Sequence, residues 1–482
     1  LYMACTFFIN TAAYGMSMGH SAVLLPQIQA ENSTIVISEE IGSWITSVYS
    51  IIGPIGSIAG GFSVDAFGRK RTHIIADCCM VLGWILITCA QNESMLLLAR
   101  IVEGTGLSAA ATANTVIADE LSDPGLRGIM LCGVYGCMFV GIILISIYGA
   151  FFHWRTASGL ATVHAFISLI MFCFICETPT WLLKMKQDKK AEKVLKYLWG
   201  PENETQAKQE FIYLKARLQI VKVTRKSKQD EILQKIMLLL KPFVLKPFLI
   251  MHFFNGIQAF CGIKLFTFYS IDILSKTTKY GADVLDIYYT NIIISILRTL
   301  ATFISCYLIF SIGRRKLAFL SGICSFLPAV ILGFLLLPSR VTDVNNPATF
   351  EGYVIYFLII LYTVGMSLGF FILPGIMIGE TQYYKLRGFL CGYIYATNDL
   401  ILGGVSKMYP WLIATIGLHG VFFMFGVSCG VCTVFVYLFV PETQGLSLQQ
   451  IEDYFKQPNI LWMSRKNVPR ENDESNTTIL LT

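Results

Sequence analysis

The chain alternates between long apolar runs and short polar connections. Windows of about 20 apolar residues are long enough to cross a bilayer as helices. Glycines, prolines and single polar residues interrupt many of these windows, which is typical of helices that pack closely and line an aqueous cavity. The pattern predicts an all-α membrane protein with twelve transmembrane helices, whose cores lie near residues 4–26, 43–64, 73–91, 95–117, 128–150, 157–176, 248–271, 287–310, 317–337, 351–378, 389–408 and 417–440.

The composition argues against a soluble protein. Of 482 residues, 55% are hydrophobic and only 14% are charged, whereas soluble domains carry about 25% charged residues. All fourteen cysteines fall within predicted spans. The two Cys-x-x-Cys pairs, at 173–176 and 429–432, lack the second pair or the histidines that a zinc site needs. Because no nucleophile–base set or phosphate loop is found either, we expect no enzymatic activity, no metal and no cofactor.

The lysines and arginines predict an orientation. With both termini in the cytoplasm, 29 of the 37 basic residues lie on the cytoplasmic side, 5 lie outside and 3 lie within spans. This bias is the one expected for a multi-pass protein of that orientation. The sequon at Asn32 then falls in a polar outside loop and is a candidate glycosylation site.

The expected organisation is two membrane bundles joined by a basic linker. The linker carries 16 basic and 7 acidic residues and should form short helices at the inner membrane face. No folded soluble domain accompanies it, so we expect contact with anionic lipid or solvated surface charge rather than nucleic acid. The predicted boundaries are 1–183 for the first bundle, 184–246 for the linker, 247–455 for the second bundle and 456–482 for a polar tail.

A set of charges occurs twice, at matching points of the two halves. A Gly-Arg-(Lys/Arg) turn is followed by Glu-x6-Arg-Gly and then by a Glu-Thr dipeptide next to proline. Charges are costly near a bilayer, so the repeat indicates one unit used twice, with ion pairs that hold the cytoplasmic ends of the helices closed. The candidate gating residues are Asp65, Arg69, Glu120, Arg127 and Glu177 in the first half, and Arg314, Arg315, Glu380, Arg387 and Glu442 in the second.

These motifs, with Ser43-Trp44-Ile45 and the run from Pro441 to Leu448, resemble the sugar porter family of the major facilitator superfamily over nearly the whole chain. Within that family the pattern is most similar to the insect facilitated trehalose transporters. The resemblance implies the major facilitator fold, with two six-helix bundles, a substrate site near the membrane midplane and alternating access. It also implies facilitative transport of a sugar, trehalose or a hexose, by a plasma-membrane protein that acts as a monomer.

The substrate positions are where this chain departs from the family. Gln258 is retained, but Lys264 and Arg298 replace asparagines, and Asp399 replaces a tryptophan. Each such charge costs roughly 3 kcal/mol at mid-span. Either the two cations bind an anionic or zwitterionic solute with Asp399 as a partner, or they pair with Asp399 or reach cavity water. The candidate substrate-binding residues are Gln258, Lys264, Tyr269, Arg298, Asn398 and Asp399.

Proton coupling is not expected. Coupled members of the family carry an aspartate just after the glycine of the first span, where this chain has His20. That histidine either titrates near neutral pH or serves packing. Glu103 lies three residues after Arg100 and can pair with it, whereas Asp77 has no obvious partner. Two alternatives to a sugar uniporter stay open: a carrier of a charged or zwitterionic metabolite, and a transport-inactive solute sensor.

Overall fold

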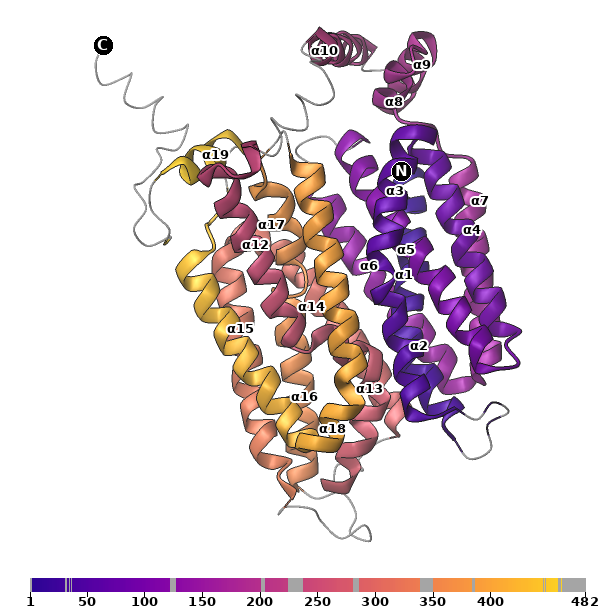
Figure 1. The fold of residues 1–482 in the computed structure, drawn as a ribbon, viewed down its shortest axis with the longest axis vertical. Coiled ribbons are helices and arrows are strands. Elements are labelled where there is room, and N and C mark those ends of the chain that lie inside the picture. The colour runs from indigo at the N-terminus through magenta and orange to yellow at the C-terminus, as the bar shows by residue number, and fades with distance from the viewer. Residues whose placement is uncertain are drawn as a thin grey trace.

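A computed structural model shows a protein whose regular elements, within the described residues, are all helices (Figure 1). They form two bundles that stand side by side, one from each half of the chain. The described residues are 2–30, 33, 35, 37–121, 127–200, 204–223, 237–280, 286–338, 350–383, 386–444, 446, 448–457 and 461.

The first bundle contains the helices α1 to α7. Helix α1 packs along α6, and α4 packs between α5 and α7. Their bounds are α1 Tyr2–Ile28, α2 Glu39–Ile51, α3 Gly53–Phe67, α4 Arg69–Thr88, α5 Glu93–Leu121, α6 Arg127–Phe151 and α7 Trp154–Cys173.

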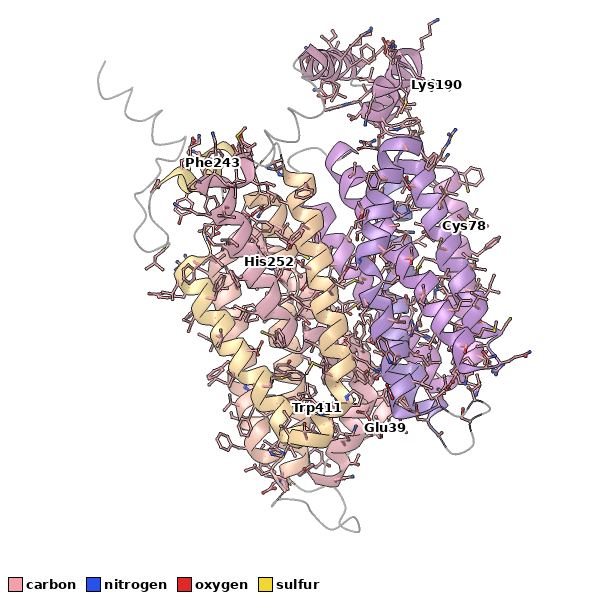
Figure 2. All side chains as sticks on the ribbon, in the orientation of Figure 1. Glu39, Cys78, Lys190, Phe243, His252 and Trp411 are labelled. Carbon is pink, nitrogen blue, oxygen red and sulfur yellow. The ribbon has the colours of Figure 1, made fainter. Side chains whose placement is uncertain are left out.

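The predicted helices of the linker are present at one end of this bundle (Figure 1). Figure 2 labels Lys190 there. We call this the linker end and the opposite one the distal end. On α9, Lys196 lies 3.2 Å from Glu192 and 3.0 Å from Glu204 of α10, so part of the linker charge is paired internally. The helices at this end are α8 Pro179–Lys184, which ends where the predicted linker begins, and α9 Asp188–Trp199 and α10 Glu204–Val223, which lie within it.

The second bundle contains α12 to α18. A short helix, α19, packs beside α12 at the linker end. The bounds are α12 Pro242–Phe260, α13 Ile263–Thr277, η2 Thr278–Tyr280, α14 Ile287–Ser311, α15 Arg314–Leu335, α16 Phe350–Leu368, α17 Leu373–Thr381, α18 Arg387–Phe439 and α19 Leu448–Lys456.

Ten helical segments of the described chain are long and apolar enough to cross a membrane. One is α18, whose 53 residues would measure about 80 Å as a single helix. It is broken at Gly417, where φ is +67°, and therefore provides two spans. Helix α1 has 27 residues, enough for about 40 Å, but buried polar residues such as Asn10 and His20 dilute its apolar character. With these two adjustments the twelve predicted spans are confirmed.

Two spans of the second bundle are broken where they approach its centre. Between α12 and α13, Gly262 has φ +87°, and the Phe425 ring lies 2.5 Å from where a Cβ would stand, so only glycine fits. Between α16 and α17, the amide of Phe370 donates to the Ser321 hydroxyl at 3.0 Å. Such breaks are tolerated in a membrane only where protein or a water-filled cavity satisfies the freed backbone groups.

Candidate substrate cavity

A cavity of about 180 Å³ lies between the two bundles. Helices α2 and α3 of the first half meet α18 here, and α6 meets α14. The polar and aromatic lining comes from both halves: Tyr49, Ser50, Ser108 and Tyr135 from the first, and Asn255, Gln258, Lys264, Phe268, Phe371, Tyr395, Asn398 and Asp399 from the second.

Amide groups and one ammonium form the polar side of the cavity. The Gln258 side-chain nitrogen donates to the carbonyl of Phe370, in the break between α16 and α17, at 2.6 Å. The Asn398 amide, oriented by its neighbours, accepts from Lys264 Nζ at 3.2 Å and donates to the Asn255 carbonyl at 3.3 Å. Four of the six predicted substrate residues (Gln258, Lys264, Asn398 and, as follows, Asp399) therefore lie together.

Asp399 lies at the contact between the two halves. Its carboxylate stands against the start of α3, where a Cβ on Gly53 would lie only 2.8 Å from Asp399 Oδ2. Asp399 and Lys264 are both half-buried and both line the cavity. Within the described residues no ion pair shorter than 4.0 Å joins them, so each keeps hydrogen-bonding capacity toward the cavity.

Arg298 lies behind the cavity wall and is only 2% exposed. Its Nη2 donates to the Thr267 hydroxyl at 3.0 Å, and its Nε donates to the Ser367 hydroxyl at 3.4 Å. The guanidinium also lies 4.8 Å from the Phe139 ring centroid of α6, across the junction of the halves. Arg298 is therefore not among the residues that line the cavity, and neutral oxygens hold it.

Tyr269 also lies outside the lining. Its ring stacks on Tyr409 with centroids 4.2 Å apart, and its hydroxyl donates to the Ser406 carbonyl at 3.0 Å. The residue departs from helical geometry, with φ −122° and ψ 22°, and so marks a kink in α13. Tyr269 thus supports the cavity from behind.

The aromatic rings of the cavity were not anticipated from the sequence. Tyr49 and Phe268, from opposite halves, meet edge to face with centroids 6.4 Å apart. Tyr135 and Phe371, also from opposite halves, do so at 5.9 Å. These rings give the cavity apolar faces beside its amides and charges. Because aromatic residues are frequent in every span, their spacing along the chain gave no signal for this role.

At the linker end, Glu177 caps helix α4. Its carboxylate accepts from the backbone nitrogen of Arg69 at 3.0 Å, from that of Lys70 at 3.2 Å and from that of Thr178 at 3.0 Å. The amides of Arg69 and Lys70 are the first of α4 and have no partner within the helix. Asp65 pairs with Lys184 of α8 at 2.8 Å, which ties the linker to the bundle.

Glu442 caps α15 in the same way in the second half. It accepts from the backbone nitrogens of Arg314 at 3.0 Å and Arg315 at 3.1 Å. Arg314 Nη2 also pairs with Glu380 at 3.0 Å, and the Thr443 hydroxyl donates to the same carboxylate at 2.6 Å. The repeated motifs therefore form equivalent caps, and each half adds an ion pair: Asp65 with Lys184 in the first and Arg314 with Glu380 in the second.

Arg387, the remaining described member of the predicted gating set, makes a local contact. Arg387 donates from Nε to the Gln382 carbonyl at 3.4 Å. The side chains of Glu120 and Arg127 lie outside the described residues, as does Asn32, the predicted glycosylation site. Their proposed roles therefore stay predictions.

The predicted pair of Arg100 and Glu103 is present and fully buried. Arg100 Nη1 lies 2.8 Å from Glu103 Oε2, and Ser17 of α1 donates to Glu103 Oε1 at 2.5 Å. The other Arg100 nitrogen, Nη2, lies 3.1 Å from His20 Nδ1. The pair therefore ties α5 to α1.

The same network fixes the protonation of His20. The Ser158 hydroxyl lies 3.0 Å from His20 Nε2 and gives its own proton to the backbone carbonyl four residues earlier, at 2.7 Å. It must therefore accept from Nε2, which carries a hydrogen. Because Arg100 can only donate, Nδ1 must accept. His20 is thus a neutral imidazole held between a cation and a hydroxyl.

A contact between the halves at the distal end was not anticipated. Lys407 of α18 donates to the Ser43 hydroxyl at 2.9 Å and to the Glu40 carbonyl at 3.2 Å. Its ammonium also lies 4.3 Å from the Trp44 ring centroid. Figure 2 labels Glu39 of α2 and Trp411 of α18 at this end, where the two helices come together. We call these contacts of Lys407 the distal latch.

Comparisons with known proteins agree with this architecture. A family model described as "Sugar (and other) transporter" matches residues 4–455. The facilitated trehalose transporter Tret1 of Culex quinquefasciatus is 30% identical over 461 residues, covering 93% of this chain and 86% of that protein. That of Aedes aegypti is 29% identical and trehalose transporter 1 of Drosophila melanogaster 30%, each over 93% of this chain. The chain spans only about half the length of these last two, 54% and 51%.

Solved structures show the fold. The proton:xylose symporter XylE bound to 6-bromo-6-deoxy-D-glucose superposes with a TM-score of 0.73 at 17% identity, covering 94% of this chain and 99% of that one. The inward open conformation of XylE from E. coli gives 0.74 at 16%, covering 94% and 98%. The chain has the major facilitator fold and is a multi-pass membrane protein.

Proposed function

Because the chain belongs to the sugar (and other) transporter family, we propose that it is a facilitative carrier that moves a sugar, trehalose or a hexose, across the plasma membrane. The observation that carries this proposal is the cavity between the halves, where aromatic rings from both bundles surround neutral amides of the second. Amides can donate to and accept from hydroxyls at once, and rings stack on the apolar faces of sugars. An enzymatic role has no support.

Lys264, Asp399, Gln258 and Asn398 bind the sugar hydroxyls in this proposal. The ammonium donates and the carboxylate accepts, so the two charges make stronger hydrogen bonds to a diol than amides would. The cavity volume of about 180 Å³ holds roughly a dozen water-sized groups at about 10–15 Å³ each, which favours a monosaccharide unit. Arg298 and Tyr269 support the cavity from behind rather than touch the sugar.

The linker end faces the cytoplasm in this proposal, as the distribution of basic residues predicts. Asp65, Arg69, Glu120, Arg127 and Glu177, with Arg314, Arg315, Glu380, Arg387 and Glu442, hold that end closed when the cavity faces outside. The distal latch of Lys407 holds the outer end closed in the opposite state. The division into 1–183, 184–246, 247–455 and 456–482 and the glycan at Asn32 belong to the same proposal, as does action as a monomer.

Energy-independent transport is supported by the neutral state of His20. A proton-coupled carrier needs a group that gains and loses a proton during the cycle. His20 is held between Arg100 and Ser158 as a hydrogen-bonded neutral ring, and Glu103 is paired with Arg100. Neither group lines the cavity.

Uptake of radiolabelled solutes into oocytes tests the proposal. The panel contains trehalose, glucose and several anionic and zwitterionic metabolites, each measured with and without a proton gradient. Saturable sugar uptake at the same rate with and without the proton gradient supports the proposed facilitative carrier. Sugar binding without flux would instead identify a transport-inactive sensor.

A second candidate is a carrier of a charged or zwitterionic metabolite. It is favoured by one observation, that Lys264 and Asp399 face one cavity without pairing with each other. The double substitution Lys264→Asn with Asp399→Asn separates the two candidates. A charged solute would lose its uptake completely, whereas a sugar would keep measurable, weaker uptake through the amides.

A further inference from the structure

A second group of polar side chains is buried in the first bundle, apart from the substrate cavity. Asp77 of α4 is 2% exposed. Its carboxylate accepts from Asn10 Nδ2 at 2.9 Å and from the Tyr14 hydroxyl at 2.8 Å, both on α1. Asn10 also donates to Ser168 of α7 at 2.7 Å. These donors are neutral, so they satisfy hydrogen bonds without neutralising a carboxylate.

His73 lies one helical turn before Asp77 and is completely buried. Its Nε2 lies 2.6 Å from the side-chain oxygen of Asn114 on α5. An amide oxygen only accepts, so Nε2 carries a hydrogen. His73 Nδ1 lies 3.8 Å from Asp77 Oδ1 and makes no hydrogen bond. The ring therefore has one free nitrogen, and that nitrogen faces a carboxylate.

Two aromatic rings lie nearly parallel to the His73 ring, so the ring is held with Nδ1 directed at Asp77. Phe172 of α7 stacks on His73 with centroids 3.9 Å apart and 14° between planes, and Tyr14 lies nearly parallel at 6.5 Å. In the described part of α1, α5 and α7, the other ionisable groups near the pair are Tyr14 and Cys173, and Cys78 follows Asp77 on α4. None of these is a cation. On α4 itself Arg69 and Lys70 lie four and three residues before His73, and Lys70 Nζ donates to the Cys173 carbonyl at 2.7 Å. Among the described contacts, the group that faces Asp77 and can become a cation is His73.

Asn114 lies on the same face of α5 as a residue that lines the cavity. It is half-buried and lies seven residues after Leu107, which lines the cavity, so both fall on one face of α5. Tyr14 likewise lies four residues before Met18, which also lines the cavity. The group thus lies just toward the linker end of the cavity and joins α4 to α1, α5 and α7.

We propose that His73 and Asp77 form a proton-binding site whose occupancy changes the transport rate of the carrier. A proton from water adds to the free Nδ1 of His73 and forms an N–H bond. In the neutral ring the lone pair of Nδ1 faces the negative Asp77 carboxylate. In the resulting imidazolium, an N–H donor takes its place and attracts that carboxylate. Because Asp77 also accepts from Asn10 and Tyr14 of α1, the new contact changes the hydrogen bonds that join α4 to α1, whose Met18 lines the cavity. The proton is an allosteric ligand here and is not carried with the solute.

Thermal unfolding of the purified full-length protein in detergent tests proton binding without any substrate. The midpoint is recorded from about pH 5 to about pH 8, the range in which histidines titrate. The variants are His73→Gln, which keeps a donor to Asn114, and Asp77→Asn; the matched control is His164→Gln, which alters a half-buried histidine on α7. As the pH falls, the midpoint of the wild type should rise relative to both variants but not relative to the control.

Flux measured at equal pH on both sides tests the effect on transport. The wild-type rate should differ at least about threefold between the ends of that pH range, and His73→Gln and Asp77→Asn should each abolish this dependence. Parallel melting curves in all four proteins would overturn the proton site, whatever the solute proves to be. A pH-dependent flux that survives in both variants would overturn its role in transport.

Discussion

Glu177 and Glu442 occupy equivalent positions in the two halves of the protein and cap equivalent helices. Glu177 accepts from the first backbone amides of α4 at 3.0 and 3.2 Å, and Glu442 accepts from those of α15 at 3.0 and 3.1 Å. A carboxylate at a helix N-terminus satisfies orphan amides and also opposes the positive end of the helix dipole. The glutamates of the duplicated motif thus mainly cap helix N-termini, and ion pairs are an additional contact.

Removing either cap should destabilise its bundle. We expect Glu177→Ala and Glu442→Ala each to cost about 0.5–2 kcal/mol, the usual value of a helix cap. The effects should add, because the two sites lie in different halves. Thermal unfolding in detergent measures the loss, with Glu192→Ala on exposed α9 as the control. Equal midpoints for Glu177→Ala and this control would contradict the capping role.

Lys264 should determine affinity for the solute. A hydrogen bond to a charged group contributes about 1.5–3 kcal/mol, so Lys264→Gln should raise KM for the transported sugar at least about tenfold. Lys276→Gln is the control, because Lys276 pairs with Asp272 within the second half and outside the cavity. Concentration-dependent uptake gives both values. An unchanged KM in Lys264→Gln would remove Lys264 from the binding site.

Arg298 should behave differently from Lys264. Neutral hydroxyls hold its buried guanidinium, and replacing such a charge by an apolar side chain of similar volume is often neutral or stabilising. We therefore expect Arg298→Met to keep KM and to leave the unfolding midpoint unchanged or raise it. A tenfold rise in KM for this variant would mean that Arg298 reaches the solute after all.

These two cations mark the limit of what the sequence could predict. The apolar windows located the twelve spans, and the Arg100–Glu103 pair followed from helical spacing because both residues lie on one helix. Lys264 and Arg298 look alike in the sequence, since each is a cation in place of an asparagine. Only the packing of α14 against α6, with Phe139 over Arg298, separates the one behind the wall from the one in the cavity.

Contacts between segments that lie far apart in the sequence could not be predicted either. The charges of the repeated motifs were recognised, but they were expected to pair with arginine side chains rather than with backbone amides. Asp77 was left without a partner, because Asn10 and Tyr14 come from another helix and are neutral. The distal latch was missed for a similar reason, since Lys407 and Ser43 lie far apart in the sequence.

The distal latch should control exposure of the cavity at that end. Lys407→Met removes the hydrogen bonds to Ser43 and Glu40 while keeping the chain length, so α18 and α2 should separate more often. Labelling of a cysteine introduced at Ser50, which lines the cavity, by a membrane-impermeant maleimide applied from outside should become severalfold faster. The Lys276→Met protein with the same Ser50→Cys change is the control. Equal labelling rates in the Lys407→Met and Lys276→Met proteins would show that the distal latch does not control exposure of the cavity.

The most direct test of the central claim is counterflow of labelled sugar in proteoliposomes that contain only the purified chain. Vesicles preloaded with unlabelled trehalose or glucose are placed in trace labelled sugar, with and without a proton ionophore. A facilitative carrier predicts transient accumulation of label that then decays, with the same time course whether or not the ionophore is added. Absence of counterflow for every sugar, or counterflow that the ionophore abolishes, would contradict the account.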